Sequence, residues 1–204
     1  HMGQLDKTFP TLDCSSRIFT PKTVEVARNK HIELLVSSEV TEVTGFVGNF
    51  KVRIQKNPTY VDFIKCTGCG DCVEACVLKK GVPSEFEESM TRRKAVYIPF
   101  PQAVPLKAVV DKESCLLLSK GKCKKTCVEA CKAGAIDFDQ KEEVIEKGVG
   151  SVIIATGYDL FDPHLLPQYG YGVNDNILTG LQFERLSSPS GPNRGEILLR
   201  DGTV

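Results

Sequence analysis

The residues best suited to chemistry in this chain of 204 residues are its nine cysteines, eight of which fall within residues 66–131. The first four have the spacing C-x2-C-x2-C-x3-C: Cys66, Cys69, Cys72 and Cys76. Thiols at i, i+3 and i+6 on a tight loop approach three irons of one [4Fe–4S] cubane from the same side. Gly68 and Gly70 let the backbone curl around such a cluster at little steric cost. The spacing therefore predicts an iron–sulfur site.

A second, less regular set of four cysteines follows, with the spacing C-x7-C-x3-C-x3-C: Cys115, Cys123, Cys127 and Cys131. We expect the longer loop Leu116–Lys122 to bulge. The tetrapeptide Val-Glu-Ala-Cys ends at both Cys76 and Cys131, which indicates internal pseudo-symmetry between the two sets.

Pseudo-symmetry of this kind predicts crossed ligation, as in bacterial ferredoxins, where the fourth cysteine of each run binds the other cluster. We expect Cys76 to start a helix and to point toward the other cluster. Cluster one would use Cys66, Cys69, Cys72 and Cys131. Cluster two would use Cys115, Cys123, Cys127 and Cys76. Two neighbouring clusters would move electrons one at a time.

Structural zinc is the alternative interpretation of the cysteines, because CxxC pairs also make zinc sites. The second set departs from ferredoxin spacing, and Val77 and Lys132 stand where ferredoxins have proline. A disulfide framework is the weaker choice in a chain without a secretory signal.

Composition narrows the classes of partner. Lysine plus arginine and aspartate plus glutamate both number 26, which argues against nucleic acid. Each oxidised cluster with four thiolates adds a charge of about −2. Apolar runs such as Val152–Ala155 are too short for membrane insertion, so we expect a cytoplasmic protein. His1 and Met2 look like a cloning remnant.

Four lysines crowd the second cysteine set: Lys120, Lys122, Lys124 and Lys125. They predict either a solvated face that compensates cluster charge or a docking patch for an acidic electron carrier.

The segments before the cysteines are predicted to form a helix, a strand and a hairpin. Thr20 and Pro21 predict a helix start, with the helix running to Arg28. Ile32–Val36 has strand character. The segments Val40–Val47 and Phe50–Gln55 alternate around the turn signal Gly48-Asn49.

Four further elements are predicted between and after the cysteine sets. Residues Glu85–Lys94 are predicted as a helix whose basic C-terminal end suits the helix dipole. Ser151–Ala155 is predicted as a buried strand, Gly180–Leu186 as a short helix capped by Thr179, and Glu196–Leu199 as a strand.

Together these elements predict an α+β fold in which a ferredoxin-like module with two [4Fe–4S] clusters is inserted in a partial α/β FAD-binding domain. The boundaries that follow are residues 3–64 and 140–204 for the flavin-domain segments and 65–139 for the dicluster module. The two flanks should pack on each other, because neither has a core of its own.

Several segments resemble the A-type subunit of heterodisulfide reductase. Val152–Asp159 is similar to the second flavin fingerprint of thioredoxin-reductase-type domains, in which Thr156 and Gly157 would pass close to the flavin. The other segments that carry the resemblance are Leu5–Lys22, Lys65–Cys72, Arg93–Pro105, Ala133–Asp139 and Thr179–Arg185. In the module, Ala133–Ile136 would form a short closing strand.

The resemblance implies that the chain is the relay fragment of an oxidoreductase component whose electron acceptor is a disulfide. FAD in the full-length protein would bifurcate electrons between ferredoxin and the CoB–CoM heterodisulfide of methanogenesis. Its partners would be other subunits of that complex and ferredoxin-type or hydrogenase electron donors. Because no G-x-G-x-x-G occurs, we expect little FAD binding by the fragment.

The kind of protein that the chain belongs to and the role of Cys14 both have alternative interpretations. The chain is alternatively part of a related flavin–iron–sulfur subunit in a membrane-associated complex of sulfate reducers, or a stand-alone dicluster carrier. Cys14 is either a free, partly buried thiol or a contact near flavin or another cluster, since Arg17 replaces the cysteine that the family pattern has there.

Overall fold

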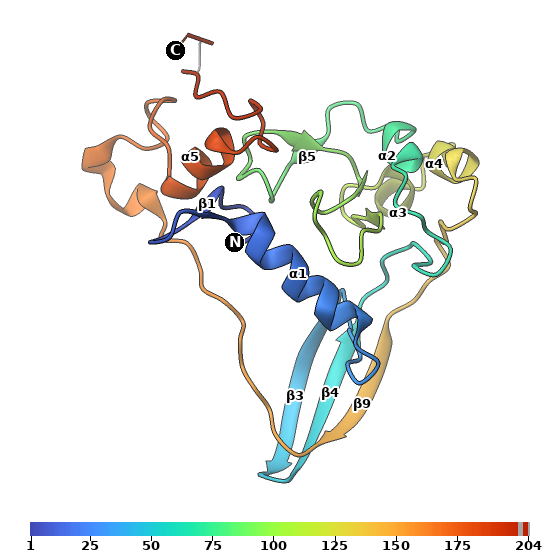
Figure 1. The fold of residues 1–204 in the computed structure, drawn as a ribbon. Helices are drawn as coiled ribbons and strands as arrows, with labels where there is room; N and C mark the ends of the chain where they lie inside the picture. The colour runs from blue at the N-terminus through green and yellow to red at the C-terminus, as the bar shows by residue number, and fades with distance from the viewer. Residues whose placement is uncertain (200–201, 204) are drawn as a thin grey trace.

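The structure is a computed structural model that describes residues 1–199 and 202–203. It is a mixed α+β protein, in which the described strands form four small sheets (Figure 1). The helices are α1 (Ser15–Arg28), α2 (Asp71–Glu74), α3 (Leu116–Lys120), α4 (Thr126–Ala130), α5 (Gly180–Ser187) and the 3-10 turns Pro163–Leu165 and Pro167–Tyr169. The two long strands of the predicted hairpin are β3 (Ser38–Phe46) and β4 (Asn49–Lys56), and β9 (Glu143–Val149) joins them. The short strands are β1 (Lys7–Thr8), β2 (Asp13–Cys14), β5 (Val82–Pro83), β6 (Arg92–Arg93), β7 (Val96–Tyr97) and β8 (Val109–Val110).

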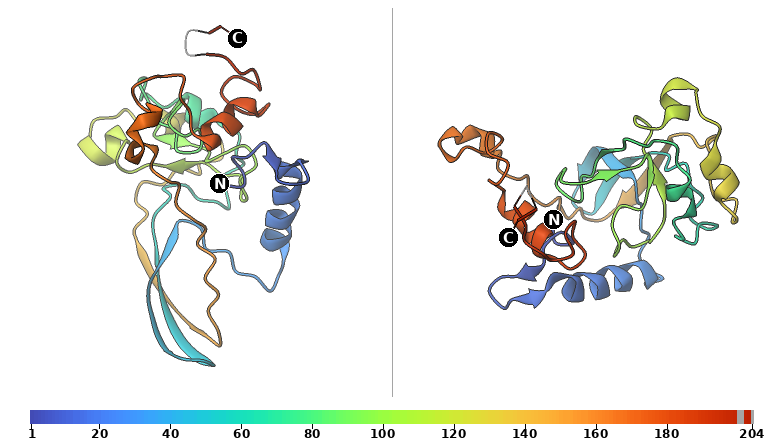
Figure 2. Two further views of the ribbon diagram at one scale, coloured as in Figure 1. Left: turned by 90° about the vertical axis from the view of Figure 1, so that its left-hand side faces the viewer. Right: turned by 90° about the horizontal axis from the view of Figure 1, so that it is seen from above.

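The predicted hairpin is confirmed and is part of a larger sheet of order β3-β4-β9, antiparallel throughout. Gly45 is required there, because a Cβ at its φ of +102° would lie 2.2 Å from the Asn49 carbonyl oxygen. The sequence did not predict β9, which brings residues of the two flanks into one ladder. This sheet projects away from the cysteine-bearing part of the molecule (Figures 1 and 2).

The first helix begins earlier than predicted, at Ser15 rather than at Pro21, and its N-cap residue is Cys14 rather than Thr20. Pro21 therefore lies inside the helix, where it removes one backbone hydrogen bond. Packing outweighs that loss: Ser15 is fully buried and donates to the Leu5 carbonyl, and the Phe19 ring centroid lies 6.2 Å from that of Phe100. The Thr-Pro signal misplaces the helix start because the packing of the preceding turn is not visible in local sequence.

Three predicted strands are wrong: Ile32–Val36, Ser151–Ala155 and Glu196–Leu199 are irregular in the structure. In the second of these, Ile153 is 90% exposed and Ile154 is 82% exposed, so the apolar run is not buried here. Their composition favours strands, but a strand also needs backbone partners, and none of the described segments pairs with them.

The predicted helix Glu85–Lys94 is also wrong, because the segment turns back on itself. β5 and β6 form a short antiparallel pair, and the connecting residues Glu88 and Ser89 have φ values of +48° and +64°. Arg93 therefore does not lie at the C-terminal end of a helix, as the prediction had it. Its guanidinium binds Glu85 (2.6 Å, Nε to Oε2) and Asp111 (3.2 Å, Nη1 to Oδ2), and these ion pairs outweigh local helix propensity.

The last helix, α5, matches its prediction. Thr179 accepts a hydrogen bond from the Gln182 amide, and the Gln182 side chain accepts one from the Thr179 amide, which is a complete capping box. From α5, Glu184 accepts hydrogen bonds from the backbone of the N-terminal segment at Asp6 (2.9 Å). The two flanks therefore contact each other at this helix as well as in the β4–β9 ladder.

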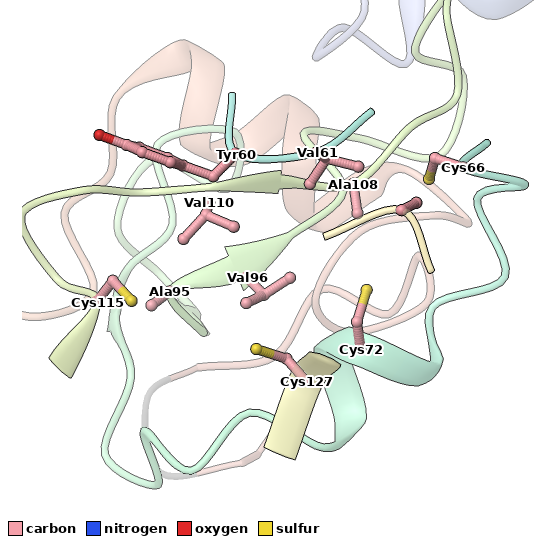
Figure 3. Close-up of a cluster of buried hydrophobic side chains, with 11 residues drawn as sticks. Tyr60, Val61, Cys66, Cys72, Ala95, Val96, Ala108, Val110, Cys115 and Cys127 are labelled. Atoms are coloured by element: carbon pink, nitrogen blue, oxygen red, sulfur yellow. The ribbon is translucent and has the colours of Figure 1, made fainter. Parts of the chain in front are cut away.

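The hydrophobic core lies in the cysteine-rich segment and includes four cysteines, Cys66, Cys72, Cys115 and Cys127 (Figure 3). The paired strands β7 and β8 run through its centre. Leu116–Lys122, predicted as a bulging loop, instead forms α3, which ends at Gly121 in the left-handed conformation.

The molecule exposes 14,160 Å² of surface, whereas a compact protein of its mass, 22.4 kDa, exposes about 9,400 Å². The excess comes from the projecting sheet and the irregular segment after it (Figure 2). Among the described residues, no helix has the length and apolarity needed to cross a membrane.

Candidate metal centre

The structure brings the eight clustered cysteines together as two groups of four. The first group lines a cavity of about 310 Å³ and consists of Cys66, Cys69, Cys72 and Cys131. The second group lines a tighter cavity of about 20 Å³ and consists of Cys76, Cys115, Cys123 and Cys127. These memberships match the crossed sets expected from the sequence, because Cys131 lies with the first run and Cys76 with the second. In Figure 3 the thiols of Cys66 and Cys72 face each other.

Two short helices present one cysteine of each group in the same way. In both α2 and α4 the cysteine is the second helical residue, and the residue before the helix has positive φ. That residue is Gly70 (φ +90°) in the first case and Lys125 (φ +56°) in the second. The two helices pack against each other (Figure 1). Cys76 follows α2 and does not start a helix, contrary to expectation, because α2 ends at Glu74.

A turn that begins at an aspartate leads into the first cysteine of each group. The Asp62 carboxylate accepts from the Ile64 amide (2.9 Å), and its carbonyl accepts from the Cys66 amide (2.9 Å). Asp111 repeats both contacts, with the Glu113 amide at 3.0 Å and the Cys115 amide at 3.0 Å. The turns hold the two first cysteines at matching places.

Hydrogen bonding keeps both carboxylates ionised. The bond from the Ile64 amide is the main cause that lowers the pKa of Asp62. Burial acts to raise the pKa of Asp111, but bonds from Ser114, Glu113 and Arg93 outweigh it, so this pKa is also lowered.

The buried thiols of the two groups have raised pKa values. Burial, and then the nearby thiols of Cys131, Cys66 and Cys69, raises the pKa of Cys72 to about 11. Burial, and then the thiols of Cys76, Cys123 and Cys115, raises the pKa of Cys127 to about 11. Both thiols therefore resist ionisation until a cation compensates the charge.

The spacing of the thiols does not suit a single-ion site. No set of three or more histidine, cysteine, aspartate or glutamate side chains in residues 1–199 and 202–203 is arranged to hold one metal ion. A zinc site draws its sulfurs to about 2.3 Å from one ion. A cubane instead binds each thiolate to a different iron, so its four sulfurs surround a larger volume.

Sequence similarity to known proteins is consistent with metal binding by the two groups of thiols. No protein-family model matches the chain. It is 52% identical over 197 residues to the A-type subunit of the H2:CoB–CoM heterodisulfide, ferredoxin reductase of Methanothermobacter marburgensis, covering 97% of this chain and 29% of that protein. The iron–sulfur A-type subunit of the CoB–CoM heterodisulfide reductase of Methanocaldococcus jannaschii is 49% identical over 202 residues, covering 98% and 30%. The chain belongs to the family of heterodisulfide reductase A-type subunits.

The same family includes a protein of Archaeoglobus profundus that is named for its likeness to this subunit; it is 44% identical over 216 residues, covering 98% of this chain and 31% of that protein. The chain spans about 30% of the length of these family members. The name of the Methanocaldococcus jannaschii relative describes an iron–sulfur subunit, which fits a chain with two groups of four thiols.

Other predicted site residues of the chain lie outside the two groups. Thr156 and Gly157 are exposed in the irregular stretch after β9, and Gly157 has φ of +81° with open space around it. Cys14 is half-buried at the start of α1. The lysines at 120, 122, 124 and 125 are exposed, and none forms an ion pair with another described residue.

Two short repeats in the sequence gain a structural meaning only from the fold. Val-Asp-x3-Cys occurs at 61–66 and at 110–115, and its aspartates make the two turns described above. Lys-Ala-Val occurs at 94–96 and at 107–109, directly before or within the paired strands β7 and β8. A search for short repeats beyond the cysteines would have found both.

Proposed function

We propose that each group of four cysteines binds one [4Fe–4S] cluster with crossed ligation. The first cluster would be held by Cys66, Cys69, Cys72 and Cys131, and the second by Cys76, Cys115, Cys123 and Cys127. The observation that supports this most directly is that two separate cavities are each lined by four thiols of the expected set. The segment 65–139 is then a ferredoxin-like dicluster module.

In this proposal the protein residues bind the clusters, orient them and shield them from water, while the bound clusters supply one-electron redox chemistry. The thiolates orient each cluster, and apolar core residues exclude water. The Ala135 amide lies 3.3 Å from the Cys131 sulfur and donates to it. Such N–H donors stabilise a reduced cluster and raise its potential. The chemistry is outer-sphere electron transfer, so no catalytic side chain is needed.

The wider proposal is that this chain is the electron relay of a heterodisulfide reductase. The relatives' names state CoB–CoM heterodisulfide reduction and, in several cases, ferredoxin or H2 as a redox partner. We infer that the chain serves the same reaction, with other subunits of that complex as partners. Thr156 and Gly157 would contact FAD in the full-length protein, whose flavin would bifurcate the electron pair.

The deciding experiment is iron and acid-labile sulfide per chain after anaerobic purification, with EPR of the reduced sample. About eight irons and eight sulfides with coupled S = 1/2 signals are expected from two neighbouring cubanes. Four irons would mean that the tighter second site holds no cluster in this chain. Zinc without sulfide would overturn the electron-transfer function.

A second experiment addresses the wider proposal. The full-length protein should contain FAD, whereas the 204-residue chain should bind little. Stoichiometric FAD in this purified chain would contradict the expectation that the missing pyrophosphate loop is needed for binding.

A further inference from the structure

Two lysines reach the backbone of the cysteine groups, one lysine for each group. The Lys94 ammonium donates to the carbonyl oxygens of Glu74 (2.9 Å) and Cys76 (3.0 Å). The Lys107 ammonium donates to the carbonyl oxygen of Cys66. Cys76 belongs to the second group and Cys66 to the first, so the two contacts are divided between the two candidate sites.

The repeated Lys-Ala-Val tripeptide produces this division. The residue after each lysine is a fully buried alanine, 1% exposed in both copies. Ala95 lines the cavity of the second group, and Ala108 lines the cavity of the first. Because β7 and β8 are antiparallel, with Val96 opposite Val110, the lysines that precede them lie at opposite ends of the ladder. Each copy therefore gives one site both a wall residue and a cation.

The charges of these two lysines have no anionic partner among the described residues. Lys94 and Lys107 are both half-buried, and neither appears in an ion pair within 4 Å in that part of the chain. Their acceptors are neutral carbonyl oxygens. The neighbouring Arg93, in contrast, is matched by Glu85 and Asp111. An anionic cluster beside each lysine would supply a counter-charge that no described residue provides.

We propose that Lys94 and Lys107 are positioning residues that compensate the charge of the two clusters, Lys94 at the second site and Lys107 at the first. This inference rests on the proposed function. Each ammonium fixes the backbone at one ligand and places a positive charge beside one cluster. A nearby cation stabilises the more negative, reduced state and so raises the reduction potential of that cluster.

The test compares Lys94→Met and Lys107→Met in the anaerobically purified, cluster-loaded chain, with Lys51→Met on the exposed face of β4 as the matched control. The measurements are iron per chain and the midpoint potentials of the two steps in an EPR-monitored redox titration. We expect Lys94→Met to lower one step, Lys107→Met to lower the other, and Lys51→Met to move neither. Full iron with both steps unchanged, or the same step lowered by both variants, would overturn the inference.

Arginine variants cover the case in which a methionine variant loses its cluster. If charge is what matters, Lys94→Arg and Lys107→Arg recover the iron that the methionine variants lose. Loss of iron in both forms would contradict charge compensation. A wild-type chain without iron would refute the proposed function itself, which is a different result from full iron with unchanged potentials.

Discussion

At the scale of single residues, two glycines near the cysteines differ in why glycine is needed: for a left-handed backbone conformation alone, or also for close approach of another segment. Gly68 has φ of +73°, and a Cβ there would lie 2.5 Å from the Leu106 carbonyl oxygen. Gly134 has φ of +58°, and a Cβ there would meet nothing within 4 Å. One glycine is therefore needed for backbone conformation and for close approach, the other for conformation alone.

We predict that Gly68→Ala prevents loading of the first site, because Leu106 must move and the cysteine loop moves with it. Gly134→Ala is the control and should cost only about 1 kcal/mol of folding free energy, the usual cost of a left-handed L-residue. Iron content and urea unfolding measure the two effects. Equal iron in both variants would show that the approach to Leu106 does not shape the site.

The raised thiol pKa values predict opposite pH dependences for the loaded and the metal-free chain. The pKa of Cys72 and that of Cys127 rise from 9.0 to about 11 in the folded, metal-free state. Folding therefore favours the protonated thiols, and that stability is present below pH 9 and is lost as the pH rises from 9 through 11.

The pH dependence of cluster binding is opposite to that of the metal-free stability, because ligation needs thiolates and releases protons. We predict that resistance of the clusters to an iron chelator increases from about pH 6.5 to about pH 8.5, while the metal-free chain is more easily unfolded by urea above about pH 9. A chelation rate that does not change over this range would contradict the protonation state assigned to the buried thiols.

At the scale of elements, Arg185 on α5 joins three parts of the chain. It is 1% exposed and binds Glu87 through two nitrogens at 3.0 Å each. It also donates to the carbonyl oxygens of Gln4 (3.3 Å) and Ser190 (3.1 Å), and its guanidinium lies 4.7 Å above the Phe86 ring. The N-terminal segment, the β5–β6 connection and α5 are thus held by one side chain.

We predict that Arg185→Met lowers the free energy of unfolding by about 3 kcal/mol, because it leaves the Glu87 carboxylate and two carbonyls without their donor. Arg53 pairs with Glu42 and Glu146 but is half exposed. Arg53→Met is therefore the control and should have a much smaller effect, since water screens such pairs. If thermal or urea unfolding shows equal losses of unfolding free energy in the two variants, the burial of Arg185 does not determine the strength of its ion pair.

The elements also show what local sequence specifies and what it leaves open. The Thr179 capping box and the glycine turn of the hairpin were predictable, because every group that stabilises them lies within a few residues. The membership of the cysteine groups was predictable from pseudo-symmetry. The pairing of β9 with β4, the ion pairs of Arg93 and the lysine contacts were not, because each depends on residues distant in the chain. Ser151–Ala155 shows the converse: strand-forming composition without a partner strand.

At the scale of the whole molecule, charge is distributed unevenly around the two sites. The chain is formally neutral, with 26 basic and 26 acidic residues. Four exposed lysines, at 120, 122, 124 and 125, lie at the loop of the second group, whereas the cavity of the first group is lined by one residue of each charge, Asp71 and Lys132. An acidic electron carrier would therefore be attracted to the second site. That gives an expected direction of approach for a redox partner at this end of the relay.

We predict that Lys122→Gln/Lys124→Gln reduces the rate constant for electron transfer with an acidic ferredoxin several-fold at low salt, and weakens its dependence on ionic strength. The control, Lys22→Gln/Lys30→Gln, removes the same charge from exposed positions on and just after α1 and should leave both unchanged. Stopped-flow mixing at several salt concentrations measures the rates. If the two double variants behave alike, the lysines only compensate cluster charge on a solvated face. If only Lys122→Gln/Lys124→Gln slows electron transfer, these lysines form the docking patch, because electrostatic steering depends on where the charge lies and not on the net charge.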